Sequence, residues 1–196
     1  MPPPTMKERA LLKNTIKAAV AAVASFVGGC SPLAGQAVES PPLATIARLD
    51  VPRYMGVWYE IAKYPNWFQS KCARETSARY TLRDDGTVEV VNRCRREDGE
   101  WNEAIGSARQ IGDADSPKLK VRFAPVWLSW LPSVWGNYWV IDLDEIYTLA
   151  AIGEPKREYL WVLSRTPTVE PSAYKDLLQR LESKGFDLSR IEGPKL

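Results

Sequence analysis

The stretch that decides the fold is Asp50–Tyr64, DVPRYMGVWYEIAKY. From Gly56 onwards it is rich in aromatic and β-branched residues, which is typical of a β-strand. A glycine directly before Trp58 indicates a tight entry, where the backbone passes close to another element. The pattern predicts a first strand over residues 56–64 that carries a core tryptophan.

Short strands at even spacing follow this first strand. Residues 76–82 and 88–94 alternate between two faces on either side of the turn sequence Asp84-Asp85-Gly86, which predicts a hairpin. Further strands are expected at 101–110, 119–123, 138–143, 147–152 and 158–165. Eight such strands predict an all-β fold, an eight-stranded antiparallel up-and-down barrel, because closure removes the exposed sheet edges.

The periodicity changes from two to 3.6 residues after Pro167. Tyr174, Leu177, Leu178 and Leu181 form one apolar stripe. Pro171 lies near the start of this segment and Gly185 just past its end, as helix boundaries prefer. The sequence therefore predicts one C-terminal α-helix that packs outside the barrel.

Composition excludes several classes of protein. The chain has 196 residues, enough for one domain, and its 26 basic residues nearly balance its 24 acidic ones, so nothing indicates nucleic-acid binding. It contains no histidine, which excludes Ser-His-Asp and Cys-His catalysis and histidine-ligated metals. We expect no metal and no cofactor.

Residues 1–29 have the pattern of a secretory leader. Basic residues are followed by an apolar run of about ten residues over 18–27, too short to span a bilayer. The run ends in Val27-Gly28-Gly29-Cys30, which resembles a bacterial lipobox with an acylated cysteine. The alternative is a plain signal peptide that contains a cysteine. Cleavage before Cys30 removes four basic residues and one acidic residue, which leaves 22 basic and 23 acidic residues and a net charge of −1.

Three stretches together carry a family resemblance. In order and spacing, Gly56–Trp58, Asn137–Asp144 and Glu158–Pro167 resemble the conserved regions of the lipocalins, most closely the bacterial outer-membrane lipoprotein lipocalins and their apolipoprotein D-like relatives. The resemblance covers about residues 47–190. The sequence departs from the family at residues 143–145, where Leu-Asp-Glu replaces Thr-Asp-Tyr and only Asp144 carries over.

The resemblance implies specific roles and boundaries. Trp58 closes the floor of the barrel and Arg165 lies across it, so Gly56, Trp58 and Arg165 are structural residues. Ser31 after Cys30 implies a lipid-anchored protein of the bacterial outer membrane, on its periplasmic face. We expect residues 30–47 to be the acylated N-terminus and a flexible tether, and residues 48–192 to be the barrel and its helix.

Two cysteines remain once Cys30 is assigned to the anchor. Cys72 precedes the second strand and Cys94 ends the third, so the hairpin brings both to one end of the sheet and parity places them on one face. Export to an oxidising compartment then predicts a disulfide. The alternative is a pair of free thiols.

The alternation also assigns side chains to the barrel interior. An eight-stranded barrel can hold one small ligand when its inward side chains are not all bulky. The residues that we expect to line a ligand are Ala78, Tyr80, Val88, Val90, Asn92, Tyr138, Val140, Trp161 and Leu163. This apolar lining with a few polar points suits an elongated amphiphile.

An uncharged aromatic loop at Pro125–Trp135 connects two strands. It is either a hydrophobic lid over the pocket or a contact with the membrane interface, where tryptophan is favoured. The residues concerned are Trp127, Leu128, Trp130 and Leu131, with Trp67 and Phe68 from a second loop expected near the same end.

The leading functional hypothesis is a membrane-anchored carrier, a monomer or weak dimer, of a fatty acid, a lysophospholipid or a similar amphiphile. Pigments such as carotenoids, tetrapyrroles and haem are bound by other family members. The second hypothesis is a lipocalin-fold enzyme that acts on a lipid or pigment, with Glu60 as its inward acid. The third is a structural envelope lipoprotein whose barrel is filled by its own side chains.

Overall fold

The computed structural model describes residues 41–194. The expected leader, Cys30 and most of the expected tether lie outside this range. None of the helices formed by residues 41–194 is both long enough and apolar enough to span a membrane.

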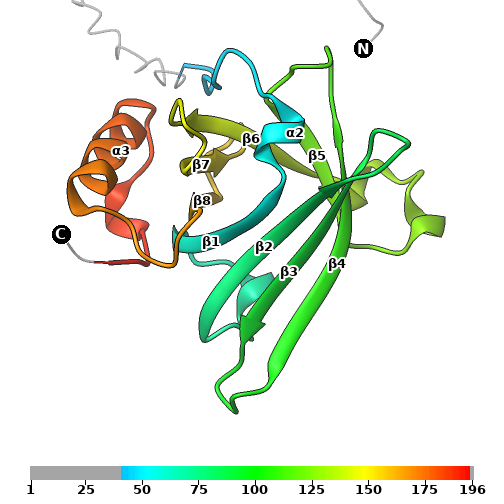
Figure 1. Ribbon diagram of the computed structural model, residues 1–196, viewed down its shortest axis with the longest axis horizontal. Helices are drawn as coiled ribbons and strands as arrows, with labels where there is room; N and C mark the ends of the chain where they lie inside the picture. Colours follow the sequence, from blue (N-terminus) through cyan, green and yellow to red (C-terminus); the bar gives the residue numbers. More distant parts are fainter. Residues whose placement is uncertain (1–40, 195–196) are drawn as a thin grey trace, which may run out of the picture. The chain divides into compact units, whose positions relative to one another are not determined.

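The described residues form a closed eight-stranded barrel, as predicted (Figure 1). Each strand pairs antiparallel with the next, and the last strand pairs with the first, so the sheet has no free edge. The strands are β1 (Gly56–Lys63), β2 (Arg74–Leu82), β3 (Val88–Arg95), β4 (Trp101–Gln110), β5 (Lys118–Arg122), β6 (Gly136–Leu143), β7 (Leu149–Gly153) and β8 (Leu160–Ser164).

The predicted β2–β3 hairpin forms around Gly86, whose φ of +77° is a conformation that glycine adopts without steric cost. In its register Ala78 faces Asn92 and Tyr80 faces Val90, so these side chains share the inner face. In this up-and-down topology the β1–β2, β3–β4, β5–β6 and β7–β8 loops lie at one end, which we call the open end. A short helix, α2 (Val51–Tyr54), leads into β1 at the opposite, closed end.

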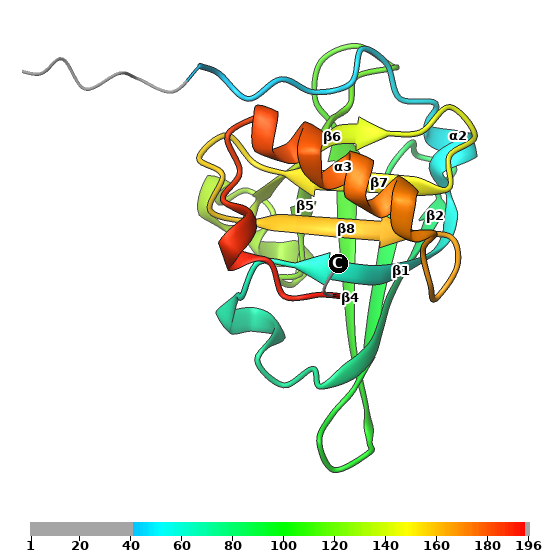
Figure 2. The ribbon, with the colours of Figure 1, turned by 90° about the vertical axis from the view of Figure 1, so that its left-hand side faces the viewer.

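The predicted C-terminal helix is α3 (Pro171–Ser183), and it packs on the outer face of the barrel (Figure 2). Tyr174, Leu177 and Leu181 are buried against outward-facing side chains of β6, β7 and β8. The Arg180 guanidinium donates two hydrogen bonds, of 2.9 and 3.0 Å, to the Asp142 carboxylate on β6. These bonds fix the helix to the sheet. Two cores result, one inside the barrel and one beneath α3.

Trp58 and Arg165 build the floor of the barrel. The Trp58 side chain is fully buried, and its Nε1 donates to the Tyr54 carbonyl at 2.8 Å. The Arg165 guanidinium carbon lies 4.0 Å from the centre of the Trp58 ring. A side chain at Gly56, whose φ is +100°, would place a Cβ 3.1 Å from the guanidinium of Arg165, so the glycine leaves room for this contact.

Residues 41–47, which we expected to form the end of the flexible tether, are part of the folded domain. The Leu43 side chain is buried in the outer core, and the Ile46 amide donates to the Val140 carbonyl at 3.1 Å. Arg157 also donates to the carbonyl of Pro41 at 2.7 Å. Residues 41–47 therefore pack against the barrel, because two apolar side chains among prolines and alanines are enough to hold them there.

Two strands, β7 and β8, begin two residues later than predicted. Tyr147, expected in a strand, has a φ of +62° and belongs to the β6–β7 turn, where the Asp144 carboxylate accepts from the amides of Thr148 and Leu149. The last strand begins at Leu160 rather than Glu158, because the buried Glu154 carboxylate accepts from the amides of Lys156 and Glu158 and so extends the turn.

We predict that Arg165→Met lowers the free energy of unfolding by about 2–3 kcal/mol, because four backbone carbonyls lose a charged donor. The measurement is chemical denaturation followed by tryptophan fluorescence. Arg79→Met is the matched control, since Arg79 is exposed and makes no side-chain hydrogen bond within residues 41–194. Equal losses in the two variants would contradict a special role of the floor.

Candidate functional site

The closed half of the barrel is nearly filled by its own side chains. It contains a cavity of about 20 Å³, which is room for about one water molecule. The cavity is lined by Leu49, Val51, Tyr54, Met55, Tyr80, Val88, Val90, Ala108, Leu119, Val121 and Tyr138. Any larger ligand inside the barrel therefore has to occupy the open half or displace these side chains.

Three tyrosine hydroxyls form a hydrogen-bonded bridge across the interior. The Tyr138 hydroxyl lies 2.9 Å from that of Tyr54 and 3.0 Å from that of Tyr80. Burial raises the pKa of Tyr80 to about 12 and raises the pKa values of Tyr54 and Tyr138 well above the usual range. All three stay protonated at neutral pH, and they mark the boundary between the filled closed half and the open half.

Towards the open end the inner wall carries the small side chain of Ala104, while the Phe123 ring packs over Gly106 deeper in the barrel. On β4, Ala104 pairs with Asn92 and Gly106 pairs with Val90, so all four face inward. Ala104 is nevertheless exposed. Because an inward-facing alanine reaches solvent here, the interior is accessible from the open end.

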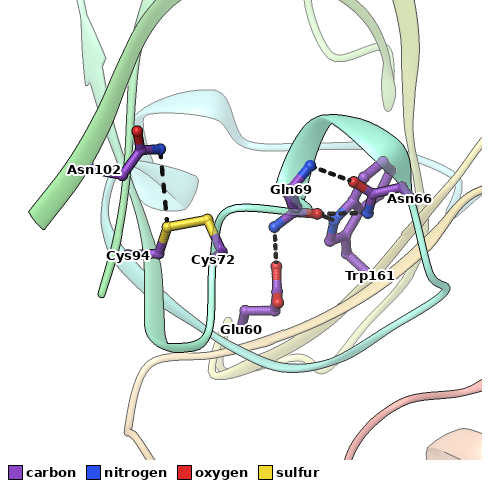
Figure 3. The surroundings of a disulfide bond; sticks show 7 residues. All are labelled: Glu60, Asn66, Gln69, Cys72, Cys94, Asn102 and Trp161. Carbon is purple, nitrogen blue, oxygen red and sulfur yellow. Dashed lines mark hydrogen bonds between the residues drawn. A yellow bond between two sulfur atoms is a disulfide. The ribbon is translucent and has the colours of Figure 1, made fainter. Parts of the chain in front are cut away.

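A polar network projects into the barrel near this end (Figure 3). The Trp161 indole on β8 donates to the Gln69 side-chain oxygen at 2.9 Å, and the Gln69 side-chain nitrogen donates to the Glu60 carboxylate on β1 at 2.7 Å. Asn66 donates to the same Gln69 oxygen at 2.6 Å. Burial raises the pKa of Glu60, and the hydrogen bond from Gln69 opposes this shift.

The predicted disulfide between Cys72 and Cys94 is present, with a Cα–Cα distance of 5.5 Å (Figure 3). It ties the β1–β2 loop, which contains η1 (Trp67–Gln69), to the end of β3. The bond therefore positions the loop that supplies Gln69 to the polar network.

Aromatic side chains surround the open end. Trp67 is 79% exposed, and Trp127 and Trp130 in the β5–β6 loop are 73% and 74% exposed. This loop contains η2 (Val126–Leu128) and η3 (Pro132–Val134), with Leu128 and Leu131 half-buried. A lid would bury its tryptophans against the pocket, so their exposure favours a surface that faces outwards. We call Trp67, Phe68, Trp127 and Trp130 the aromatic rim.

The structure places most of the expected lining residues in the inner core. These are Ala78, Tyr80, Val88, Val90, Tyr138, Val140, Trp161 and Leu163, while Asn92 is half-buried on the same face. Sequence reasoning missed Tyr54 and Gln69, because one precedes the first strand and the other lies in a loop with no periodicity. It noted Glu60 as an inward acid but not its partners.

Catalytic and metal-binding chemistry finds little support in the described residues. Across residues 41–194 there is no group of three Cys, Asp or Glu side chains placed to hold a metal. Two other buried carboxylates lie outside the interior, since Asp142 binds Arg180 and Glu154 caps a turn. Within residues 41–194, the acid that acts on Glu60 through space is Glu192, which is paired with the Lys63 ammonium rather than free for paired acid–base work.

Comparison with known proteins gives consistent matches. The family model described as a lipocalin-like domain matches residues 49–195. Temperature-induced lipocalin-1 of Arabidopsis thaliana is 42% identical over 155 residues, 78% of this chain and 82% of that protein. Outer membrane lipoprotein Blc of Escherichia coli is 35% identical over 176 residues, 88% and 92% of the two chains. Apolipoprotein D of Mus musculus is 31% identical over 159 residues, 78% of each chain.

We predict that Tyr138→Phe lowers the free energy of unfolding by about 1–3 kcal/mol, because the buried hydroxyls of Tyr54 and Tyr80 lose their shared partner. Thermal or chemical denaturation measures the loss. Tyr59→Phe is the control, since the Tyr59 hydroxyl makes no hydrogen bond within the described residues. A loss no larger than that of the control would show that the bridge contributes nothing to stability.

Proposed function

The chain belongs to the lipocalin family, as the family match over residues 49–195 and the relatives above 30% identity show, and from this premise we propose that it binds a single-chain hydrophobic amphiphile. The ligand class includes a fatty acid or a lysophospholipid. The observation that carries the proposal is the solvent-accessible inner wall at the open end, made of small and apolar side chains above the tyrosine bridge.

The energetics of transfer are sufficient for binding without any covalent chemistry. A sixteen-carbon chain gains roughly 11 kcal/mol on leaving water, at about 0.8 kcal/mol for each methylene. Association itself costs an estimated 4–15 kcal/mol. Micromolar affinity is therefore within reach of an apolar pocket with a few polar contacts.

Storage or transport, rather than catalysis, is the activity that we assign to this pocket. The enzyme alternative needs a partner for Glu60, and the described interior supplies no second carboxylate and no nucleophile–base pair. The structural alternative, a filled barrel, fits the closed half but not the accessible wall around Ala104.

We assign the protein to the bacterial outer membrane, held by an acyl anchor on Cys30 with its barrel on the periplasmic face, as a monomer or weak dimer. The lipobox-like sequence at residues 27–30 supports this assignment, as does a relative that is named an outer membrane lipoprotein. Each buried acyl methylene contributes about 0.8 kcal/mol, so several chains hold the protein essentially permanently.

The aromatic rim is proposed to touch the same membrane. Tryptophan is favoured at the membrane–water interface, and the rim surrounds the end through which a ligand has to enter. At the base of the β5–β6 loop, Arg109 and Arg122 lie over the Trp135 ring, at 4.4 and 5.2 Å from its centre. Arg122 is buried, whereas Arg109 is exposed and suitably placed to face lipid phosphates while the exposed tryptophans enter the interface.

Ligand binding is tested with the full chain carrying Cys30→Ser, which lacks the acylation site. Titration with a lysophospholipid is expected to change the fluorescence of Trp161 and to saturate at one ligand per chain. Mass analysis of the recovered ligand separates the hypotheses. Unchanged ligand supports a carrier, a converted ligand supports an enzyme, and the absence of any response supports a structural protein.

Membrane contact is tested with liposomes. Replacement of Trp127, Trp130 and Leu131 by serine in the Cys30→Ser chain is expected to weaken liposome binding several-fold, because interfacial apolar area is lost. Ile146→Ser is the control, since Ile146 is 71% exposed but lies in the β6–β7 turn at the closed end. Unchanged liposome binding in the triple variant would leave the rim without a role at the membrane.

A further inference from the structure

The Glu60 carboxylate has one oxygen that the protein leaves unsatisfied. One oxygen accepts from Gln69 at 2.7 Å, and the second makes no hydrogen bond within residues 41–194. Within the described residues, the fully buried side-chain atoms without a hydrogen-bond partner are the Arg122 Nε and the Tyr174 hydroxyl. The second Glu60 oxygen is therefore not fully buried. It therefore borders open space while most of the side chain is buried.

The network fixes the direction in which Glu60 presents its charge. Because the Trp161 indole and Asn66 both donate to the Gln69 oxygen, the Gln69 amide has to direct its nitrogen towards Glu60. The disulfide holds the loop that carries Gln69. Glu60 is thus a positioned acceptor at the wall of the pocket rather than a mobile surface carboxylate.

No nearby cation neutralises Glu60. The Lys63 ammonium acts on it through space, but Lys63 is itself paired with the Glu192 carboxylate, which acts in the opposite sense. Arg165 is engaged at the floor by four backbone carbonyls. The other groups facing the interior, the hydroxyls of the tyrosine bridge, are neutral. The open half therefore carries one uncompensated negative charge.

Four aromatic rings gather at the open end around Trp161, whose indole is joined to Glu60 through the Gln69 side chain. Tyr159 and Trp161 are stacked with their ring centres 6.0 Å apart, and Phe68 lies 5.6 Å from Tyr159 and 6.1 Å from Trp161. Trp67 meets Phe68 edge to face at 5.6 Å. Aromatic faces attract cations, and clusters of this kind recognise quaternary ammonium groups.

The geometry points to an ammonium-bearing head group as the polar part of the ligand, held between the Glu60 carboxylate and the rings of Trp161, Tyr159 and Phe68. This inference rests on the proposed function and narrows it. An ammonium group compensates the negative charge of Glu60, whereas a fatty-acid carboxylate brings a second negative charge to the same place. The chain of the ligand then lies along the small inner wall of β2–β4.

The experiment compares three sixteen-carbon probes whose head groups are cationic, neutral and anionic: hexadecyltrimethylammonium, hexadecanol and palmitate. Each is titrated below its micelle concentration or solubility limit into the Cys30→Ser chain, with tryptophan fluorescence as the readout. We expect the ammonium probe to bind about tenfold more tightly than the alcohol, and palmitate to bind more weakly than the alcohol. This comparison needs no substitution in the pocket.

Glu60→Gln, which keeps an acceptor for Gln69, is expected to remove the difference between the ammonium and alcohol probes. Glu103→Gln is the matched control, since Glu103 is an exposed carboxylate on β4.

The outcomes separate this inference from the proposed function. Equal affinities for all three probes, unchanged by Glu60→Gln, would overturn the head-group site and leave a non-selective amphiphile carrier. Preferential binding of palmitate would overturn it as well. Failure of every probe to bind would contradict the proposed function, and with it the head-group site.

Discussion

The guanidinium of Arg165 is the contact on which the arrangement of the barrel depends. It covers the buried Trp58 ring and donates to backbone carbonyls of Arg53, Tyr54, Val57 and Tyr147. These carbonyls belong to the entry segment, to β1 and to the β6–β7 turn, so one side chain joins the parts of the chain that meet at the closed end. With that end sealed, the barrel has a single direction of access.

Above the floor, polar groups divide an otherwise apolar interior. The tyrosine bridge satisfies its three hydroxyls internally and fills the closed half, while the Glu60 network leaves one oxygen unsatisfied near the open end. Buried polar groups are costly unless they are paired, so the unsatisfied oxygen is a place in the interior where a ligand would gain more than apolar contact. In the proposed function, the inner wall sets the affinity and the network sets the selectivity.

Local patterns predicted the elements well, because each pattern reports a local constraint. Alternation in residues 76–94 predicted the hairpin and its inner face, the 3.6 period of Tyr174 to Leu181 predicted the helix, and parity predicted that Cys72 meets Cys94. The polar networks could not be predicted, since Tyr54 and Tyr138 are 84 positions apart and Trp161 and Gln69 are 92 apart. Their contacts depend on the shear of the whole barrel. Leu43 was missed because a single leucine carries no period.

Because residues 41–47 pack on the barrel, the proposed tether between the barrel and the membrane is shorter than the sequence predicted. With the anchor proposed at Cys30, only residues 31–40 remain to span the gap, and a fully extended chain of that length reaches at most about 35–40 Å. With the proposed anchor, a tether of this length would keep the barrel close to the lipid surface and would make renewed contact with the bilayer a frequent intramolecular event.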